Sequence, residues 1–238
     1  SAMNFTWATR TDPGKVRDHN EDAVLPEPGS NGADDHLIAA IADGMGGHAG
    51  GEIASSTAIA TVAAVSGDAA IRIEAANLAV LDAAAQRPRL TGMGTTLTLG
   101  IFDADGSLHV GHVGDSRAYM LRKGELTRLT TDHSFVSEML AAGRLTEAEA
   151  AVHPYRSVLT RAIGLETAVE IEVLRFELAA KDRVLICSDG VTAMIDDDAI
   201  RAVLEAESDP EVAAEKLIAA ANNAGGADNI TAVVVDVG

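Results

Sequence analysis

Apolar residues follow two different periods along the chain, and the two periods separate predicted strands from predicted helices. Short apolar runs between turn residues predict β-strands, at residues 5–12, 37–42, 95–102, 108–113, 117–122, 126–129, 169–177, 183–187 and 230–237. Ala-rich stretches with apolar residues three and four apart predict α-helices, at residues 49–65, 68–86, 197–206 and 209–223. Because strands and helices are grouped and not alternating, the pattern favours an α+β protein over a doubly wound parallel sheet.

The connections between these elements predict antiparallel pairing. Asp105-Gly106 and Lys123-Gly124 each separate two neighbouring strands, and Gly tolerates the positive φ that tight hairpin turns require. We expect a polar connection between the strands at 5–12 and 37–42, and a partly helical surface segment over residues 132–164, with helices at 135–142 and 146–152. No linker, repeat or low-complexity tract divides the chain, which predicts one domain over residues 3–238 after a tag remnant at Ser1-Ala2.

The composition narrows the classes of partner. The chain has 238 residues, of which 47% are apolar but only 3% aromatic, so Ala, Val, Leu and Ile must build the core. The net charge of −18, from 36 acidic and 18 basic residues, makes nucleic acid and anionic lipid improbable partners. We find no apolar stretch long enough to span a membrane and no export signal. A soluble, cytoplasmic protein is therefore expected, and its single cysteine excludes an internal disulfide.

Four aspartates, each close to a strand-like run, form the most informative polar pattern. They are Asp22, Asp43, Asp189 and Asp228. Folding could gather them at one edge of a sheet, where carboxylates repel one another unless a hard cation lies among them. The pattern therefore predicts a metal site, and oxygen ligands without a His/Cys cluster favour Mn²⁺ or Mg²⁺ over zinc.

Six short motifs occur in a fixed order along the chain. They are Arg17-Asp18-His19-Asn20-Glu21-Asp22, Asp43-Gly44-Met45-Gly46-Gly47-His48, Gly94-Thr95-Thr96, Val113-Gly114-Asp115-Ser116-Arg117, Ser188-Asp189-Gly190 and Asp228-Asn229. Together they resemble the metal-dependent protein phosphatases of the PPM or PP2C family, in the compact bacterial form. The resemblance implies a four-layer αββα sandwich, in which two antiparallel β-sheets are flanked by helices, with two Mn²⁺ or Mg²⁺ ions at one end.

The resemblance also implies roles for the acidic residues. Asp43 would bridge the two ions, with the carbonyl of Gly44 on one of them, and Asp189 and Asp228 would hold the other. Glu21 and Asp22 would orient metal-bound waters. Asp115 would help to hold a third, weaker ion together with Asp189; the alternative is that Asp115 only caps the following strand.

Two further residues have predicted roles in the reaction. Arg17 would clamp the phosphate through its guanidinium group; the alternative is a surface ion pair with a neighbouring Asp. Animal members of the family have His directly after Asp-Gly, where this chain has Met45. His48 is then a candidate proton donor to the leaving group, although it could equally cap the helix that follows or orient substrate, and a metal-bound water could be the acid instead. We expect His109, His112 and His133 to be ordinary strand or surface residues.

The implied reaction is hydrolysis of phosphoserine and phosphothreonine in proteins by a metal-activated water, without a phosphoenzyme. A serine/threonine kinase and its substrates are the implied partners, and we expect a monomer. The non-enzyme alternative is a pseudophosphatase that binds phosphoproteins without turnover. Two other classes of phosphatase are disfavoured. The segment around Asp103 resembles the motif of the haloacid-dehalogenase phosphatases, which form a phosphoaspartate, but Asp103 stands in a predicted hairpin and not on a parallel βαβ strand. A cysteine-based phosphatase would need an arginine six residues after Cys187, where Ala193 stands.

Overall fold

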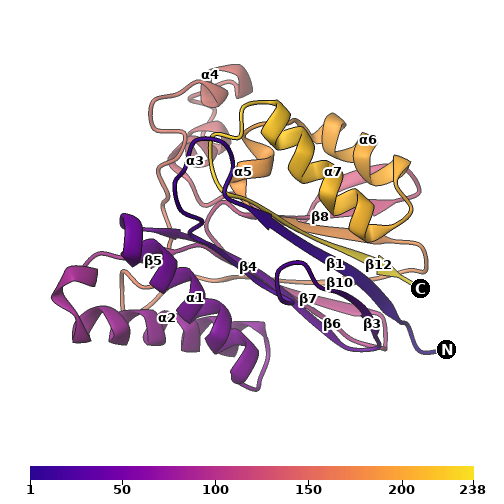
Figure 1. The fold of residues 1–238 in the computed structure, drawn as a ribbon, viewed down its shortest axis with the longest axis horizontal. Helices are drawn as coiled ribbons and strands as arrows, with labels where there is room; N and C mark the ends of the chain where they lie inside the picture. The colour runs from indigo at the N-terminus through magenta and orange to yellow at the C-terminus, as the bar shows by residue number, and fades with distance from the viewer.

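The fold has four layers, with two β-sheets packed face to face and a layer of helices outside each. The computed structural model describes the backbone of all 238 residues and every side chain except that of His48. Figure 1 shows one pair of long helices, α1 and α2, below the lower sheet, and α5, α6 and α7 above the upper sheet. This is the predicted αββα sandwich, and the predicted α+β class is confirmed.

The upper sheet has six strands, all paired antiparallel. In spatial order they are β3 (Asn31–Asp34), β1 (Phe5–Asp12), β12 (Ile230–Val237), β11 (Arg183–Cys187), β8 (Arg117–Arg122) and β9 (Glu125–Arg128). The first and last strands of the chain lie side by side, with Phe5 opposite Val237 and Asp12 opposite Ile230. This pairing brings the loop after β1 close to the loop before β12.

The lower sheet is also antiparallel. Its strands, in spatial order, are β10 (Glu172–Glu177), β7 (Ser107–Val113), β6 (Leu97–Phe102), β4 (Leu37–Met45) and β2 (Asp22–Leu25). The short strand β5 (Gly94–Thr95) pairs with the end of β4, where Gly44 lies opposite Thr95. The last residues of β4 are therefore held between β2 on one side and β5 on the other.

The helices occupy three places around the sheets. Their bounds are α1 (His48–Ala64), α2 (Ala69–Gln86), the 3₁₀ turn η1 (Pro88–Leu90), α3 (Phe135–Ala141), α4 (Glu147–Ala151), α5 (Asp189–Thr192), α6 (Asp197–Ala206) and α7 (Pro210–Asn223). Helices α3 and α4 project from one end of the sandwich (Figure 1). None of the helices, over the residues that the structure describes, has the length and apolar character of a membrane span.

Three apolar layers hold the four structural layers together. Phe5, Phe102 and Val233 belong to the layer between the two sheets. A second layer packs α1 and α2 against the lower sheet, and a third packs α6 and α7 against the upper sheet. Burial of this apolar surface is the main stabilising contribution to such a fold, and it uses small aliphatic residues as the composition predicts.

The observed elements differ from the predicted ones in a few places. The predicted polar connection contains two short strands, β2 and β3, and the strand predicted from residue 169 begins at Glu172. The short helix α5 was not predicted. Strand β3 has no apolar alternation to mark it, and Gly32 in β3 lies directly against the ring of Trp7. Strands β2 and β3 form because they pair with β4 and β1, and no local apolar pattern predicts them.

Both predicted hairpin turns are present. Gly106 follows β6 with a φ of +89°, and Lys123 and Gly124 follow β8 with φ of +50° and +80°. The second pair matches the two positive-φ residues of a type I′ turn. Asp103 therefore lies at the start of a hairpin turn, which fits neither a parallel βαβ unit nor the phosphoaspartate chemistry that depends on one.

Candidate active site

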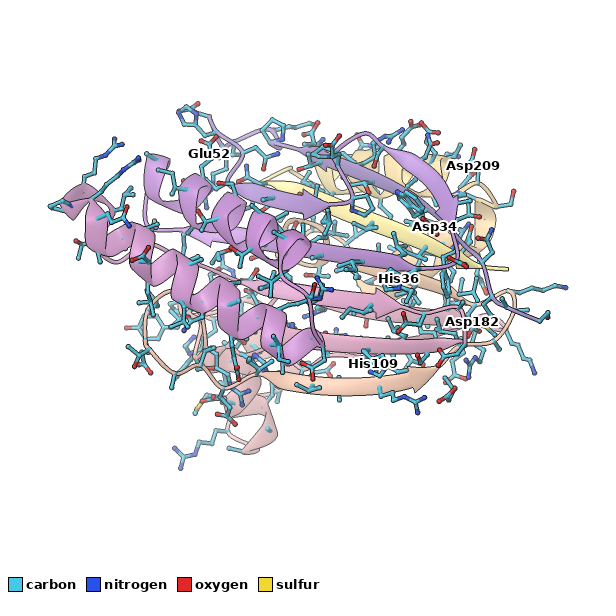
Figure 2. All side chains as sticks on the ribbon, turned by 90° about the horizontal axis from the view of Figure 1, so that it is seen from below. Asp34, His36, Glu52, His109, Asp182 and Asp209 are labelled. Carbon is cyan, nitrogen blue, oxygen red and sulfur yellow. The ribbon has the colours of Figure 1, made fainter. Side chains whose placement is uncertain are left out.

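The predicted aspartates lie around a cleft at one end of the sandwich. The cleft has a volume of about 580 Å³, and Asp43, Asp115, Asp189 and Asp228 all line it. Figure 2 shows Glu52 near the start of α1, close to this end, with His109 and Asp182 toward the other end of the molecule. Asp22 does not line the cleft, but it lies directly opposite Asp43 in the β2–β4 pair.

Backbone contacts fix Asp43 and Gly44 at the end of β4. Asp43 N–H donates to the hydroxyl of Thr96 at 3.0 Å, and Thr96 N–H donates to Asp43 C=O at 2.9 Å. Gly44 N–H donates to the carbonyl of Glu21 at 3.0 Å. A Cβ on Gly44 would lie only 1.9 Å from the carbonyl oxygen of Gly51 in α1. Glycine is therefore required here, because the first turn of α1 passes directly over the strand end.

Asp22 is held by a chain of hydroxyl groups. The Thr231 hydroxyl donates to Asp22 Oδ2 at 2.6 Å and lies 2.7 Å from the Thr11 hydroxyl. Asn20 Oδ1 accepts from Asp22 N–H at 3.0 Å, and Asn20 Nδ2 donates to Thr11 Oγ1. The other carboxylate oxygen, Asp22 Oδ1, is inaccessible to solvent and has no hydrogen-bond partner. Although the residue as a whole is half-buried, its carboxylate is enclosed.

Asp189 and Asp228 reach the cleft from the far side. Asp189 begins α5 directly after β11, and its Oδ1 is buried without a hydrogen-bond partner. A Cβ on the next residue, Gly190, would lie 1.8 Å from the carbonyl oxygen of Asn229, so the two loops are in contact. Asp228 accepts from Asn229 N–H, and it also pairs with Arg17 at 3.4 Å (Nε–Oδ1).

Asp115 follows Gly114 in the turn between β7 and β8. The next residue, Ser116, is fully buried, and its hydroxyl lies 3.0 Å from the hydroxyl of Thr96. Since Thr96 also bonds Asp43, these two hydroxyls connect the turn to the end of β4. Asp115 lines the cleft, and its role as an ion ligand or as a cap of the following strand stays a prediction.

The carboxyl groups of this cluster resist ionisation. Burial raises the pKa of Asp22 to about 7, with a further contribution from the charge of Asp189. Burial, followed by the charges of Asp22 and Asp189, raises the pKa of Asp43 well above its ordinary value. The pKa values of Asp115 and Asp189 are also raised, chiefly by burial. The cause is the same throughout, because several carboxylates share an enclosed site with too little positive charge.

The chemistry of this site fits hard divalent cations. Two enclosed carboxylate oxygens, Asp22 Oδ1 and Asp189 Oδ1, have no hydrogen-bond partner, and such groups are costly unless a cation or water satisfies them. Among the side chains that the structure describes, no three His, Cys, Asp or Glu residues are arranged as a ligand group for one ion. Waters and backbone carbonyls would therefore complete each ligand shell, as Mg²⁺ commonly allows.

The other predicted site residues differ in how they are placed. Arg17 lines the cleft and is half-exposed, and its pairing with Asp228 corresponds to the ion pair considered as an alternative to a phosphate clamp. The side chain of Glu21 lies against α1, with its carboxylate about 3 Å from where a Cβ on Gly51 would stand. The side chain of His48 lies outside the described part of the structure, so its predicted role stays a prediction. Met45 lines the cleft.

Asn229 makes contacts within the candidate site that the sequence did not indicate. It is 3% exposed, and its side chain bonds three backbone groups of the loop after β1: the N–H of Glu21 and the carbonyls of Pro13 and His19. One amide side chain therefore holds the loop with Arg17 and Glu21 against the loop with Asp228. The motif Asp228-Asn229 marks the residue, but only the fold reveals its contacts.

The chain is similar to proteins of one family over nearly its whole length. Residues 15–220 match the family model described as Protein phosphatase 2C. The serine/threonine protein phosphatase PstP of Mycobacterium tuberculosis (strain CDC 1551 / Oshkosh) is 44% identical over 97% of this chain. The chain spans 45% of the length of that relative. The serine/threonine phosphatase stp of Listeria welshimeri is 35% identical, over 95% of this chain and 94% of its own.

A solved structure agrees with this assignment. The crystal structure of the catalytic domain of PstP in complex with two manganese ions matches with a TM-score of 0.87 and 39% identity, over 99% of each chain. Sequence identity and similarity of fold both extend over nearly the whole chain. On these grounds the chain belongs to the protein phosphatase 2C family.

Proposed function

We propose that this chain is a metal-dependent protein phosphatase that hydrolyses phosphoserine and phosphothreonine. The observation that supports it best is the gathering of Asp43, Asp115 and Asp189 around one cleft, with Asp22 opposite Asp43 in the adjoining strand. All four have raised pKa values, and two of their buried oxygens lack a hydrogen-bond partner. Such a site has a strong affinity for divalent cations because they remove the repulsion between the carboxylates. The PstP catalytic domain binds two manganese ions on the same fold.

The proposed ligands follow the predicted roles. Asp43 and the Gly44 carbonyl would serve one ion and Asp43, Asp189 and Asp228 the other, with Glu21 and Asp22 orienting waters and Asp115 contributing to a third, weaker site. Since the described side chains do not already group three such ligands around one point, we expect these carboxylates to move toward the ions on binding. When bound, the ions supply the positive charge that lowers the pKa of the attacking water and neutralises the phosphoryl oxygens.

The remaining steps belong to side chains of the cleft. Arg17 is half-exposed at its rim, where its guanidinium group can leave Asp228 and pair with phosphate oxygens. The loops that Asn229 holds keep Arg17 and Asp228 on the same side of the cleft. His48 remains the candidate proton donor to the leaving oxygen. The alternative of a phosphoprotein-binding protein without turnover has no observation in its favour, since every aspartate of the set is present.

The proposal extends to the setting of the reaction. We infer that residues 3–238 act as one catalytic domain, in the cytoplasm and as a monomer, on proteins phosphorylated by a serine/threonine kinase. The stp relative is a serine/threonine phosphatase by name, and the match covers 94% of its length. It therefore supports the inference that these residues act as one catalytic domain.

A direct test uses para-nitrophenyl phosphate and a phosphothreonine peptide. We expect hydrolysis that requires Mn²⁺ or Mg²⁺, stops with EDTA and is reduced by a factor of at least about 100 in Asp43→Asn. Asp103→Asn is the matched control, because Asp103 lies in a hairpin outside the cleft, paired with His36. Unchanged activity in Asp43→Asn, or loss of activity in Asp103→Asn, would contradict the proposal.

A further inference from the structure

His133 is a buried histidine to which the proposed reaction assigns no role. It was expected to be an ordinary strand or surface residue, but it lies in the loop between β9 and α3 and is only 5% exposed. Its ring packs against that of His112, with 4.7 Å between the ring centroids and a tilt of 38° between the ring planes. A buried imidazole normally has partners for both nitrogens, so its contacts indicate what it does.

The first set of contacts joins His133 to Gly114. The backbone N–H of Gly114 donates to His133 Nδ1 at 3.0 Å, and the backbone N–H of His133 donates to Gly114 C=O at 2.8 Å. One residue therefore binds both polar groups of Gly114. Gly114 has a φ of +112°, and a Cβ there would lie 2.7 Å from the side chain of Thr96. The backbone directly before Asp115 is thus fixed by His133 on one side and by Thr96 on the other.

The second set of contacts joins His133 to the segment 132–164, which we call the flap. Thr160 N–H donates to His133 C=O at 3.0 Å, and Ser134 forms an isolated antiparallel bridge with Leu159. Leu159 and Ser157, on the same arm of the flap, line the cleft that Asp115 also lines. His133 is therefore the point at which the flap and the Gly114–Asp115 turn are bound to one residue.

The contacts also define the state of the ring. Because Nδ1 accepts a hydrogen bond, the ring hydrogen must be on Nε2, and the ring must be neutral. Nε2 faces Glu172 Oε2 in β10 at 3.5 Å, longer than an ordinary hydrogen bond. Burial and the charge of Arg161 lower the pKa of His133, against the opposing charges of Glu172 and Asp132. A neutral ring that accepts from Gly114 agrees with this environment.

We propose that His133 is a positioning residue that sets the place of Asp115 relative to the flap, through the acceptor Nδ1 and the backbone of Gly114. The inference rests on the proposed phosphatase function, because Asp115 and the flap border the same cleft. It assigns to His133 no contact with the substrate or with an ion. What matters is one acceptor atom at the position of Nδ1, in an uncharged side chain.

Two substitutions separate the acceptor from the size of the side chain. His133→Asn places an amide oxygen close to the position of Nδ1 and keeps the acceptor, whereas His133→Leu has similar bulk without one. We expect kcat for the phosphothreonine peptide to be about tenfold lower in His133→Leu and within about twofold of the wild type in His133→Asn. His109→Leu, the same chemical change in the far half of β7, is the matched control and should leave kcat unchanged.

A double-mutant cycle with Asp115→Asn distinguishes positioning from a general structural role. If His133 acts through Asp115, His133→Leu should reduce kcat no further in the Asp115→Asn background. An equal tenfold loss in both backgrounds would overturn the inference, as would equal losses in His133→Asn and His133→Leu. All variants are compared at a temperature where thermal melting shows them folded.

A measurement without metal or substrate tests the contact itself. In the EDTA-treated protein, nitrogen NMR should show a proton on His133 Nε2 and none on Nδ1, and the Gly114 amide should exchange slowly with solvent. We expect exchange to be about tenfold faster in His133→Leu but not in His133→Asn. A proton on Nδ1, or equal exchange in all variants, would overturn the inference while leaving the proposed phosphatase function intact. A wild type inactive with Mn²⁺ would instead overturn the proposed function.

Discussion

Neutralising Asp22 should stabilise the metal-free protein at pH 8, although it removes a residue of the active site. The enclosed carboxyl of Asp22 has its pKa raised from 3.8 to about 7, first by burial. Each unit of pKa difference between the folded and unfolded states corresponds to about 1.4 kcal/mol. Ionisation of Asp22 at pH 8 therefore lowers the free energy of unfolding by about 4 kcal/mol. Asp22→Asn keeps an oxygen that can accept from Thr231 but has no charge to bury.

The sign of this effect depends on pH. Below pH 3.8 the carboxyl is protonated in the folded and unfolded states, so wild type and variant should be equally stable. Between pH 3.8 and about 7 the folded state retains a proton that the unfolded state releases, and the wild type therefore loses stability as the pH rises. Above about pH 7 the wild type stays less stable than Asp22→Asn by the full difference of about 4 kcal/mol.

The assay is thermal and urea unfolding in EDTA at pH 5 and pH 8. For a chain of this size a difference of about 4 kcal/mol corresponds to a melting temperature about 10 °C higher for Asp22→Asn at pH 8, with a much smaller difference at pH 5. Asp18→Asn removes the same charge from an exposed position in the loop before β2 and should change stability by less than about 0.5 kcal/mol. A variant less stable than the wild type at pH 8, or a difference independent of pH, would refute the argument.

Three further predictions concern residues outside the titrating cluster. Gly44→Ala should lower the free energy of unfolding by about 3 kcal/mol or more, because its Cβ would stand 1.9 Å from the Gly51 carbonyl oxygen; a urea transition unchanged from that of the wild type would contradict this. The Cys187 thiol, with burial raising its pKa to about 12, should react with a thiol reagent at pH 8 only after unfolding, and rapid reaction of the native protein would show the thiol to be accessible. Arg183→Met should destabilise the protein by about 3 to 5 kcal/mol, since it leaves Asp236 without its bidentate partner and three carbonyls near the end of α6 without a donor; activity at low temperature should be retained.

The sequence by itself determined most of the strands and helices and the family. Apolar runs such as residues 230–237 and 183–187 became the buried strands β12 and β11, and the helix predicted over residues 68–86 is α2, which Asp68 caps. The aspartate motifs are local as well, because each stands just after or just before an apolar run. These features depend on a residue's own neighbours in the chain, which is why a single sequence is enough to predict them.

Only the tertiary structure decided how these segments meet. Strands β2 and β3 form in a polar stretch because β4 and β1 offer them partners, and the register of one of these pairs places Asp22 opposite Asp43. Contacts between distant residues likewise appear only in the fold. Arg17 pairs with Asp228, two hydrogen bonds join His133 to Gly114, and Asn229 is buried between loops. Hydrogen bonds and burial at such positions depend on which distant segments pack together, and no local pattern specifies that.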